Sequence, residues 1–414
     1  GGSCVAVGVN ALSSNTTATE NTAIGHQALY LNTTGYHNTA LGRDALRANT
    51  TANANTAIGR YCMGVNTTGA ENVAIGANAL DANTTASYNT AVGYGTLSAN
   101  TTAISNTAVG YIALALNTTG AQNTGIGREA LYANTTAVSN TAVGYRSLYV
   151  NTTGAYNNAV GVQALQDNTT ANSNNAFGYQ CLYKNTTGTD NTAAGHGALA
   201  SNTTANNNTA FGANALLANT TATAVTAVGM DSLKANTTGN YNTAVGRSSL
   251  QANTTGYSNT GMGINALYSN TTGGFNVALG QSALEANTTA SQNTAVGYEA
   301  MILNTTGTQN TAVGYRPLNR NTTGNYCTAV GNETLYNNTT GQYNVAVGGA
   351  VLDANTTGTY NTAIGYGSLS ENTTASSNVA VGTNSLQLNT TAAHNTAVGY
   401  AALQVNTTGS ENVS

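Results

Sequence analysis

The chain has 414 residues, of which 6% are charged, with one proline, no tryptophan and a formal net charge of −4. An average soluble domain is about 25% charged, so the core is expected to consist of small and medium aliphatic residues. Disorder is disfavoured because disordered chains combine low hydrophobicity with high net charge or abundant proline. The sequence has no run of basic residues that would predict binding to nucleic acid. It also has no apolar run long enough to predict insertion into a membrane.

The tripeptide Asn-Thr-Thr begins at Asn15 and returns every 17 residues until Asn406, giving 24 copies without an insertion or deletion. With this Asn as position 1, the unit reads N-T-T-G/A-x-x-N-T-A-V-G-x-x-A-L-x-x. Such a period is typical of stacked units that each touch only their neighbours. Seventeen residues are too few for a helical hairpin, and short β-compatible runs bounded by Gly and Asn turns favour strands. We therefore expect an all-β fold, a parallel β-solenoid (β-roll) of 24 coils that forms an elongated rod, with residues 1–414 as one uncapped domain.

Asparagine occupies position 1 and, in most units, position 7, and each is expected to stack on its copies in neighbouring coils. Such ladders would satisfy backbone groups in the turns. Every Asn-Thr-Thr also matches the N-glycosylation pattern, so glycans on the position 1 asparagines are the alternative. Glycans about 4.8 Å apart would collide, which favours the ladder. The first ladder residues are Asn15, Asn32, Asn49 and Asn66 at position 1 (also the glycan candidates) and Asn21, Asn38 and Asn72 at position 7.

Two short strands per coil are predicted, at positions 8–10 (usually Thr-Ala-Val) and at the Ala-Leu segment of positions 14 and 15. Alternation would turn position 10 inward beside Leu29, Leu46 and the other leucines of position 15. Position 11 is Gly in every unit, which predicts a positive φ or a close approach that a Cβ would block; early examples are Gly25, Gly42 and Gly59. Positions 9, 11 and 14 would form a smooth outward stripe suited to lateral self-association.

Residues that could carry chemistry are scattered. Cys4 and Cys327 stand at position 7, and Cys62 and Cys181 at position 14. These residues lie too many coils apart to bridge, because a disulfide needs Cα atoms within about 7 Å, so free thiols are expected. The four histidines are equally dispersed and predict no metal site. No carboxylate pair, Ser-His-Asp set or phosphate loop recurs, so we expect neither an enzyme nor a bound cofactor.

Tyrosines and charged residues fall only at positions 5, 6, 12, 13, 16 and 17, which are expected to line the outside. Tyr94, Tyr111, Tyr298 and Tyr315 at position 12 suit contact with sugar or protein, or stacking over a thin core. The regularly spaced threonines suggest ice binding as a further possible function, since flat threonine arrays look like the surfaces of some antifreeze proteins. The adjacent threonines of positions 2 and 3 should point opposite ways, which disfavours that function.

Three segments, 72–76, 276–280 and 344–348, read Asn-Val-Ala-Ile-Gly, Asn-Val-Ala-Leu-Gly and Asn-Val-Ala-Val-Gly. They resemble the head repeats of trimeric autotransporter adhesins, and related repeats look like those of some phage tail fibres. The likeness extends over every unit. The resemblance implies a left-handed parallel β-roll, homotrimerisation and adhesion to a host or matrix.

These patterns predict a structural protein of the extracellular space, cell surface or virion surface that forms a fibre by self-association. The partner would be the chain itself, head to tail or side by side. Open ends favour filaments because the repeat runs from Val5 to Asn412 without a polar or helical cap. The alternatives are a trimeric adhesin head that binds glycans or a host surface and, less favoured, an ice-binding solenoid.

Overall fold

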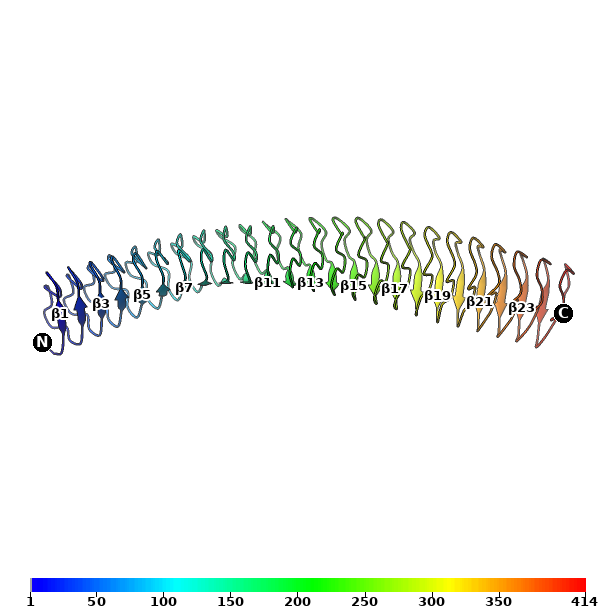
Figure 1. Ribbon diagram of the computed structural model, residues 1–414, viewed down its shortest axis with the longest axis horizontal. Helices are drawn as coiled ribbons and strands as arrows, with labels where there is room; N and C mark the ends of the chain where they lie inside the picture. The colour runs from blue at the N-terminus through cyan, green and yellow to red at the C-terminus, as the bar shows by residue number, and fades with distance from the viewer. Residues whose placement is uncertain (1) are drawn as a thin grey trace. The chain divides into compact units, whose positions relative to one another are not determined.

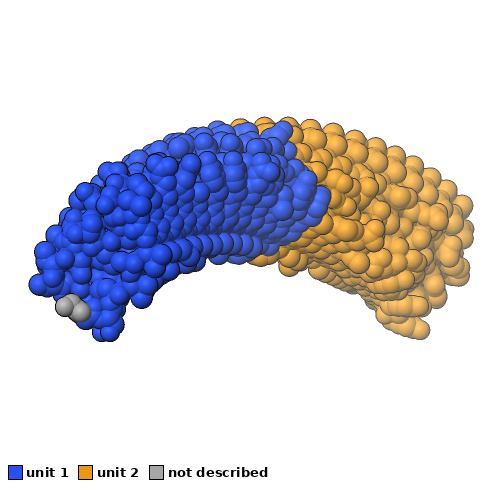
Figure 2. Space-filling view, turned by 60° about the vertical axis from the view of Figure 1, so that its left-hand side comes forward, with its two compact units in different colours: residues 1–207 blue, residues 208–414 orange. Residues whose placement is uncertain are grey.

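The computed structural model describes residues 2–414, which form a parallel β-solenoid without helices (Figure 1). Two compact units cover residues 1–207 and 208–414, coloured blue and orange in Figure 2. Each unit holds twelve strands of three residues, and every strand occupies positions 8–10 of its coil. No helix that is long and apolar enough to span a membrane occurs within residues 2–414. The predicted fold class is confirmed.

The strands follow one another along the chain at the interval of one coil. Those of the first unit are β1 (Val5–Val7), β2 (Thr22–Ile24), β3 (Thr39–Leu41), β4 (Thr56–Ile58), β5 (Val73–Ile75), β6 (Thr90–Val92), β7 (Thr107–Val109), β8 (Thr124–Ile126), β9 (Thr141–Val143), β10 (Asn158–Val160), β11 (Asn175–Phe177) and β12 (Thr192–Ala194). Those of the second unit are β13 (Thr209–Phe211), β14 (Thr226–Val228), β15 (Thr243–Val245), β16 (Thr260–Met262), β17 (Val277–Leu279), β18 (Thr294–Val296), β19 (Thr311–Val313), β20 (Thr328–Val330), β21 (Val345–Val347), β22 (Thr362–Ile364), β23 (Val379–Val381) and β24 (Thr396–Val398).

Neighbouring strands within each unit pair in parallel between equivalent positions, as where Ala40 of β3 faces Ala57 of β4. Backbone hydrogen bonds between coils continue outside the strands. The N–H of Leu29, for example, donates to the carbonyl of Ala45 at 3.0 Å. A coil therefore completes its backbone hydrogen bonds mainly through the coils on either side of it, as expected for a repeat whose units contact only their neighbours.

Position 9, rather than position 10, points into the coil. Ala40 and Ala57 are fully buried, whereas Leu41, the next residue after Ala40, is 43% exposed. The prediction that position 10 faces inward is therefore wrong. The small residues of positions 9 and 14 line the interior, so the predicted outward stripe of positions 9, 11 and 14 does not exist as such.

The reason is lack of space beside the leucine of position 15. Leu29 and Leu46 are fully buried, as predicted, and fill the coil. A Cβ added to Gly125, at position 9 of β8, would already lie 3.3 Å from Leu114 Cδ1 and from the carbonyl oxygen of Ala130. Position 9 thus accepts at most a methyl group, and the bulky side chains of the strand point outward.

The segment at positions 14 and 15 forms a turn, so the predicted second strand is wrong. Leu29 and Leu46 have φ values of 49° and 50°, in the left-handed region. Such a conformation costs about 1–2 kcal/mol for a residue other than glycine. Burial of the leucine side chain contributes about 1.5–3 kcal/mol and offsets this cost.

The glycine of position 11 meets both conditions predicted for it. Gly25, Gly42 and Gly59 have φ values of 135°, 135° and 139°. A Cβ added to Gly42 would lie 2.5 Å from the carbonyl oxygen of Gly59 in the next coil. The corner after each strand therefore requires glycine.

Two asparagine ladders run through the interior. At position 1, Asn49 Nδ2 donates to Asn32 Oδ1 at 2.8 Å and to the carbonyl of Ala52 at 3.0 Å. At position 7, the N–H of Asn38 donates to Asn21 Oδ1 at 2.9 Å. The ladders are confirmed. The predicted ladder residues Asn21, Asn32, Asn38, Asn49, Asn66 and Asn72 are buried, and Asn15 is half-buried.

The position 7 ladder of the second unit is interrupted at Val225, a departure that the sequence reasoning overlooked. The N–H of Val225 still donates to Asn208 Oδ1 at 3.0 Å, but the valine side chain offers no acceptor to the N–H of Asn242. Asn242 Nδ2 instead donates to the carbonyl of Gly239 in its own coil at 3.0 Å, besides its usual bond to Gly256. Val225 therefore removes one rung from this ladder, and Cys327, also at position 7, replaces the asparagine of another coil in the same unit.

Restoring that rung should stabilise the fold. In Val225→Asn, the new Oδ1 would accept from the N–H of Asn242, and we expect the free energy of unfolding to rise by about 1 kcal/mol. The midpoint of urea unfolding, followed by circular dichroism, measures this change. The matched control Asn259→Val removes an intact rung and should lower the free energy by about 1–3 kcal/mol. A lower midpoint for Val225→Asn would show that the missing rung does not limit stability.

Candidate functional site

The outward side chains of positions 8 and 10 form a continuous surface on each unit, which we call the sheet face. Position 8 is Thr in 17 of the 24 strands and otherwise Val or Asn. Position 10 is a large apolar residue in every strand except β12, which ends in Ala194. Ile24 is 37% exposed, Met262 44% and Phe177 47%. An apolar row thus lies on the surface beside a row of mainly threonines.

The sheet face carries no charged residue. Strands about 4.8 Å apart, with positions 8 and 10 about 6.6 Å apart, give it an area of about 400 Å² per unit. The largest apolar patch on a typical monomer measures about 300–600 Å² and is often an interaction site. The sheet face of each unit falls in that range, which makes it a candidate interaction surface.

The four tyrosines predicted for surface contact form two stacked pairs. The rings of Tyr94 and Tyr111 lie 5.7 Å apart in the first unit, and those of Tyr298 and Tyr315 lie 5.6 Å apart in the second. The guanidinium of Arg128 lies 5.7 Å from the Tyr111 ring, within reach of a cation–π interaction. All four rings are exposed. They stack across coils as expected, and their contact with a ligand stays a prediction.

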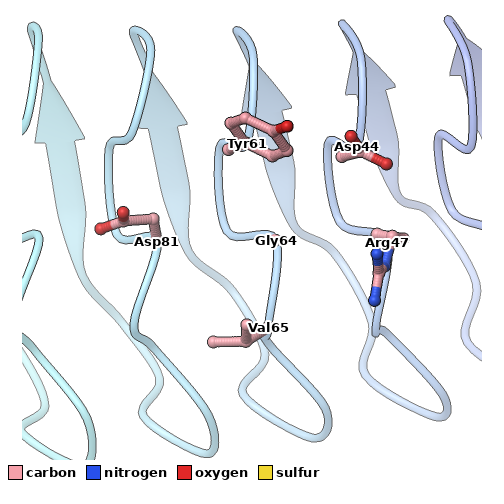
Figure 3. Close-up of a pocket in the computed structure, with 6 residues that line it drawn as sticks. All are labelled: Asp44, Arg47, Tyr61, Gly64, Val65 and Asp81. Atoms are coloured by element: carbon pink, nitrogen blue, oxygen red, sulfur yellow. The ribbon is translucent and has the colours of Figure 1, made fainter.

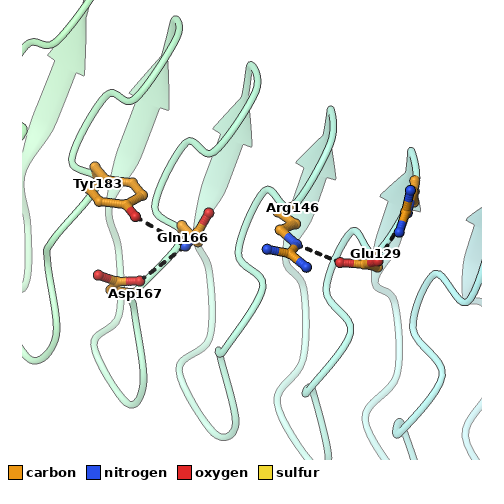
Figure 4. A network of polar contacts seen from close by, with 6 residues as sticks. Glu129, Arg146, Gln166, Asp167 and Tyr183 are labelled. Carbon is orange, nitrogen blue, oxygen red and sulfur yellow. Dashed lines mark hydrogen bonds and ion pairs between the residues drawn. The ribbon is translucent and has the colours of Figure 1, made fainter.

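Buried charge at position 13 is paired across coils. Glu129, whose side chain is 7% exposed, accepts hydrogen bonds from Nε of Arg146 in the next coil and of Arg128 (Figure 4). The hydrogen bond from Arg146 holds the pKa of Glu129 below its ordinary value. Farther along the unit, Gln166 Nε2 lies 3.4 Å from the Tyr183 hydroxyl. The contacts of Glu129 with Arg146 and of Gln166 with Tyr183 join neighbouring coils.

A hollow of about 260 Å³ lies at Gly64, where position 16 has no side chain (Figure 3). A Cβ there would make only ordinary contact, 3.4 Å from the carbonyl oxygen of Tyr61, so the backbone does not require glycine. Asp81 Oδ1 is buried without a hydrogen-bond partner. Arg47 and Asp81 lie on opposite sides of Gly64, in the preceding and following coils. The hollow therefore brings no catalytic set together. It is lined by Asp44, Arg47, Tyr61, Gly64, Val65 and Asp81.

The cysteines are free thiols, as predicted. Cys62, Cys181 and Cys327 are buried, and Cys4 is half-buried. Burial raises the pKa of Cys62 and of Cys181 to about 12 and that of Cys327 to about 11. Within residues 2–414, no three His, Cys, Asp or Glu side chains are grouped so that they could hold a metal ion.

The glycosylation candidates lie inside the ladder. Asn32, Asn49 and Asn66 are fully buried, and Asn49 Nδ2 already donates two hydrogen bonds. A glycan would replace one of the Nδ2 hydrogens and has no space inside the coil. The folded geometry therefore argues against glycans at these three residues, while Asn15 is half-buried.

The sequence reasoning missed the sheet face because it placed position 10 in the core. The pattern that could have revealed the face is the size limit at position 9, which is Ala or Gly in all 24 strands, while position 10 also accepts Phe177, Phe211 and Met262. No protein-family model matches the chain, and no curated protein matches its sequence.

The charge of Asp81 should make stability depend on pH. Burial raises the pKa of Asp81 above its ordinary value, so the folded chain binds this proton more tightly than the unfolded chain does. The ionised carboxylate therefore destabilises the fold at pH 7, and this effect fades as pH falls toward the unfolded pKa of about 3.9. We expect Asp81→Asn to raise the melting temperature at pH 7 but not at pH 3.5. The same gain from the exposed control Asp190→Asn would refute the role of burial.

Thiol accessibility gives a second check on the interior. A thiol reagent should label at most one cysteine per native chain, Cys4, because the other three thiols are buried. In denaturant all four should react. Mass spectrometry after timed labelling counts the modified thiols. Rapid native labelling of Cys62 or Cys181 would contradict the closed interior of their coils.

Proposed function

We propose that this chain is a structural, non-enzymatic protein that self-associates through the sheet face into an extracellular or virion-surface fibre. The observation that carries the proposal is the exposed, uncharged apolar row at position 10 of both units. The largest apolar patch on a soluble protein, which is commonly of this size, is often an interaction site. A covering partner accounts for such a surface.

The magnitude of the apolar surface supports association through more than one unit. Covering about 400 Å² contributes at most about 10 kcal/mol at ~25 cal/mol per Å². Association costs about 4–15 kcal/mol in lost freedom of motion. The face of one unit is therefore marginal by itself, and contacts made by the face of each unit would add to the stability of an assembly.

A second copy of the chain is the partner that fits the sheet face best. The rows of the face repeat once per coil, at the spacing of about 4.8 Å between strands. A second copy presents rows at the same spacing, so side chains of the two faces can match along their length. The absence of charge on the face also removes the repulsion that would oppose pairing of identical surfaces.

Charges placed on the sheet face should prevent assembly. In the variant Ile75→Asp/Ile126→Asp, two exposed residues of position 10 become charged, and we expect the assembly to dissociate at micromolar concentration. Sedimentation velocity measures the mass. The control Thr68→Asp/Thr119→Asp adds the same charge at exposed residues of position 3, away from the sheet face, and should assemble normally. Equal assembly of both variants would exclude the sheet face as the contact.

Ice binding is a second candidate function, favoured by the outward threonine row of position 8. The threonines of position 2 are engaged elsewhere, as where Thr33 Oγ1 donates to the carbonyl of Thr50 at 3.1 Å. The position 8 threonines instead share the outward face of the strands with the apolar row. Faceted ice crystals grown in the presence of the protein would favour this function, and unshaped discs would exclude it. Adhesion to glycans or a host surface, as a trimeric head, remains a prediction from the family resemblance.

A further inference from the structure

Tyrosines and arginines form a cluster on the first unit around the buried Glu129, part of which is seen in Figure 4. The ring of Tyr111 stacks on that of Tyr94 in the preceding coil and lies 5.7 Å from the guanidinium of Arg128 in the following coil. The guanidinium of Arg128 also lies 5.8 Å from the ring of Tyr145. Four consecutive coils thus carry Tyr, Tyr, Arg and Tyr at position 12, which we call the tyrosine–arginine row.

The surroundings of this row leave a surplus positive charge. Residues 82–166 contain three charged side chains, those of Arg128, Glu129 and Arg146. Two arginines and one glutamate give a formal charge of +1 (2 − 1), whereas the whole chain carries −4. The nearest acidic residue after them, Asp167, lies in the second coil after that of Arg128, on the side away from Tyr111. The charge at Arg128 and Tyr111 therefore favours an anionic ligand.

Arg128 keeps hydrogen-bond donors for such a ligand. Its Nε donates to Glu129 Oε1 at 3.0 Å, and Arg146 Nε donates to the other carboxylate oxygen. The side chain of Arg128 is 61% exposed, so the N–H groups on its two Nη atoms are accessible. A guanidinium binds a carboxylate through two parallel hydrogen bonds. The contact with Glu129 holds the guanidinium in place before a ligand binds, which lowers the cost of binding.

An open hollow of about 340 Å³ lies against Tyr111 and Arg128. The Tyr111 ring is 49% exposed and offers an apolar surface next to the guanidinium. A ligand that uses both groups has an acid attached to a ring with an apolar face. Nucleic acid fits less well, because it carries a phosphate on every nucleotide and each phosphate contact needs its own cation. A surplus of one charge fits a ligand with one isolated acid group.

We propose that the hollow at Tyr111 and Arg128 binds a sugar acid, a hexuronate residue within an otherwise neutral glycan. Arg128 binds the carboxylate through its Nη atoms, and the ring of Tyr111 packs against the C–H face of the pyranose ring. The site lies within the first unit and does not depend on self-association through the sheet face.

The second unit contains a similar pair of tyrosines without the surplus charge. Tyr298 and Tyr315 stack at 5.6 Å, and the guanidinium of Arg316 lies 5.2 Å from the Tyr315 ring. Arg316 Nε donates to Glu299 at 2.7 Å, and Glu333 occupies the same position of the following coil. This arginine is flanked at position 13 by two glutamates, so a sugar acid is not expected to bind there. The second unit therefore serves as an internal control.

Three small molecules test the ligand class. We expect D-glucuronate to bind the native chain with a millimolar Kd in a titration followed by ligand-observed NMR. D-glucose lacks the carboxylate and acetate lacks the ring, so each should bind at least about tenfold more weakly. Equal binding of glucose would overturn the role of Arg128 in recognising an acid. Equal binding of acetate would overturn the role of the Tyr111 ring.

Substitutions test the site. Arg128→Gln leaves Glu129 paired with one arginine and no surplus charge, and should weaken glucuronate binding at least about tenfold. The matched control Arg316→Gln removes the same charge from the second unit and should leave the Kd unchanged. Tyr111→Val, with a residue that position 12 already carries at Val162, should weaken binding about threefold. Circular dichroism confirms that each variant folds. Equal Kd values for the two arginine variants would overturn the site, and sedimentation tests self-association separately.

Discussion

The interior of each coil has room for one large side chain, and the leucine of position 15 occupies it. Its presence leaves only enough space for a methyl group at position 9, as the short distances around Gly125 show. The valine or isoleucine of the strand is consequently turned to the surface. The outward direction of the position 10 side chains is thus a result of how the core is filled, and the same constraint explains why the interior is thin.

A thin core makes polar packing inside the coil decisive for stability. Asparagines at positions 1 and 7 are buried, and a buried amide without partners costs more free energy than a satisfied one gains. In-register stacking satisfies them because each amide meets its copy in the next coil. Where Val225 breaks the row, the amide of Asn242 turns to the carbonyl of Gly239 in its own coil. The side-chain amide of the neighbouring asparagine thus keeps a second acceptor despite the break.

Much of this architecture could be predicted from the period alone. An invariant 17-residue spacing dictates stacking, and stacking dictates ladders of buried asparagine and a glycine corner such as Gly42. The direction of the strand side chains was predicted wrongly because apolar character was taken as the sign of burial. Side chains alternate in direction along a strand. If this alternation had been counted from Asn38, which is buried at position 7, position 9 would have been predicted to point inward and position 10 outward. The left-handed backbone conformation of Leu29 and Leu46 could not be predicted from the sequence, because leucine rarely adopts a positive φ. The candidate surface was missed for the same reason as the strand direction.

Equivalent positions meet only their own copies in the coils before and after them. Removal or addition of one 17-residue repeat within a unit would therefore join the same kinds of side chain as before, with the ladders and strand pairing continued. Each such step would change the length of the unit by about 4.8 Å without altering its chemistry. The number of repeats can therefore set the length of a unit, while the contacts that stabilise each coil stay the same.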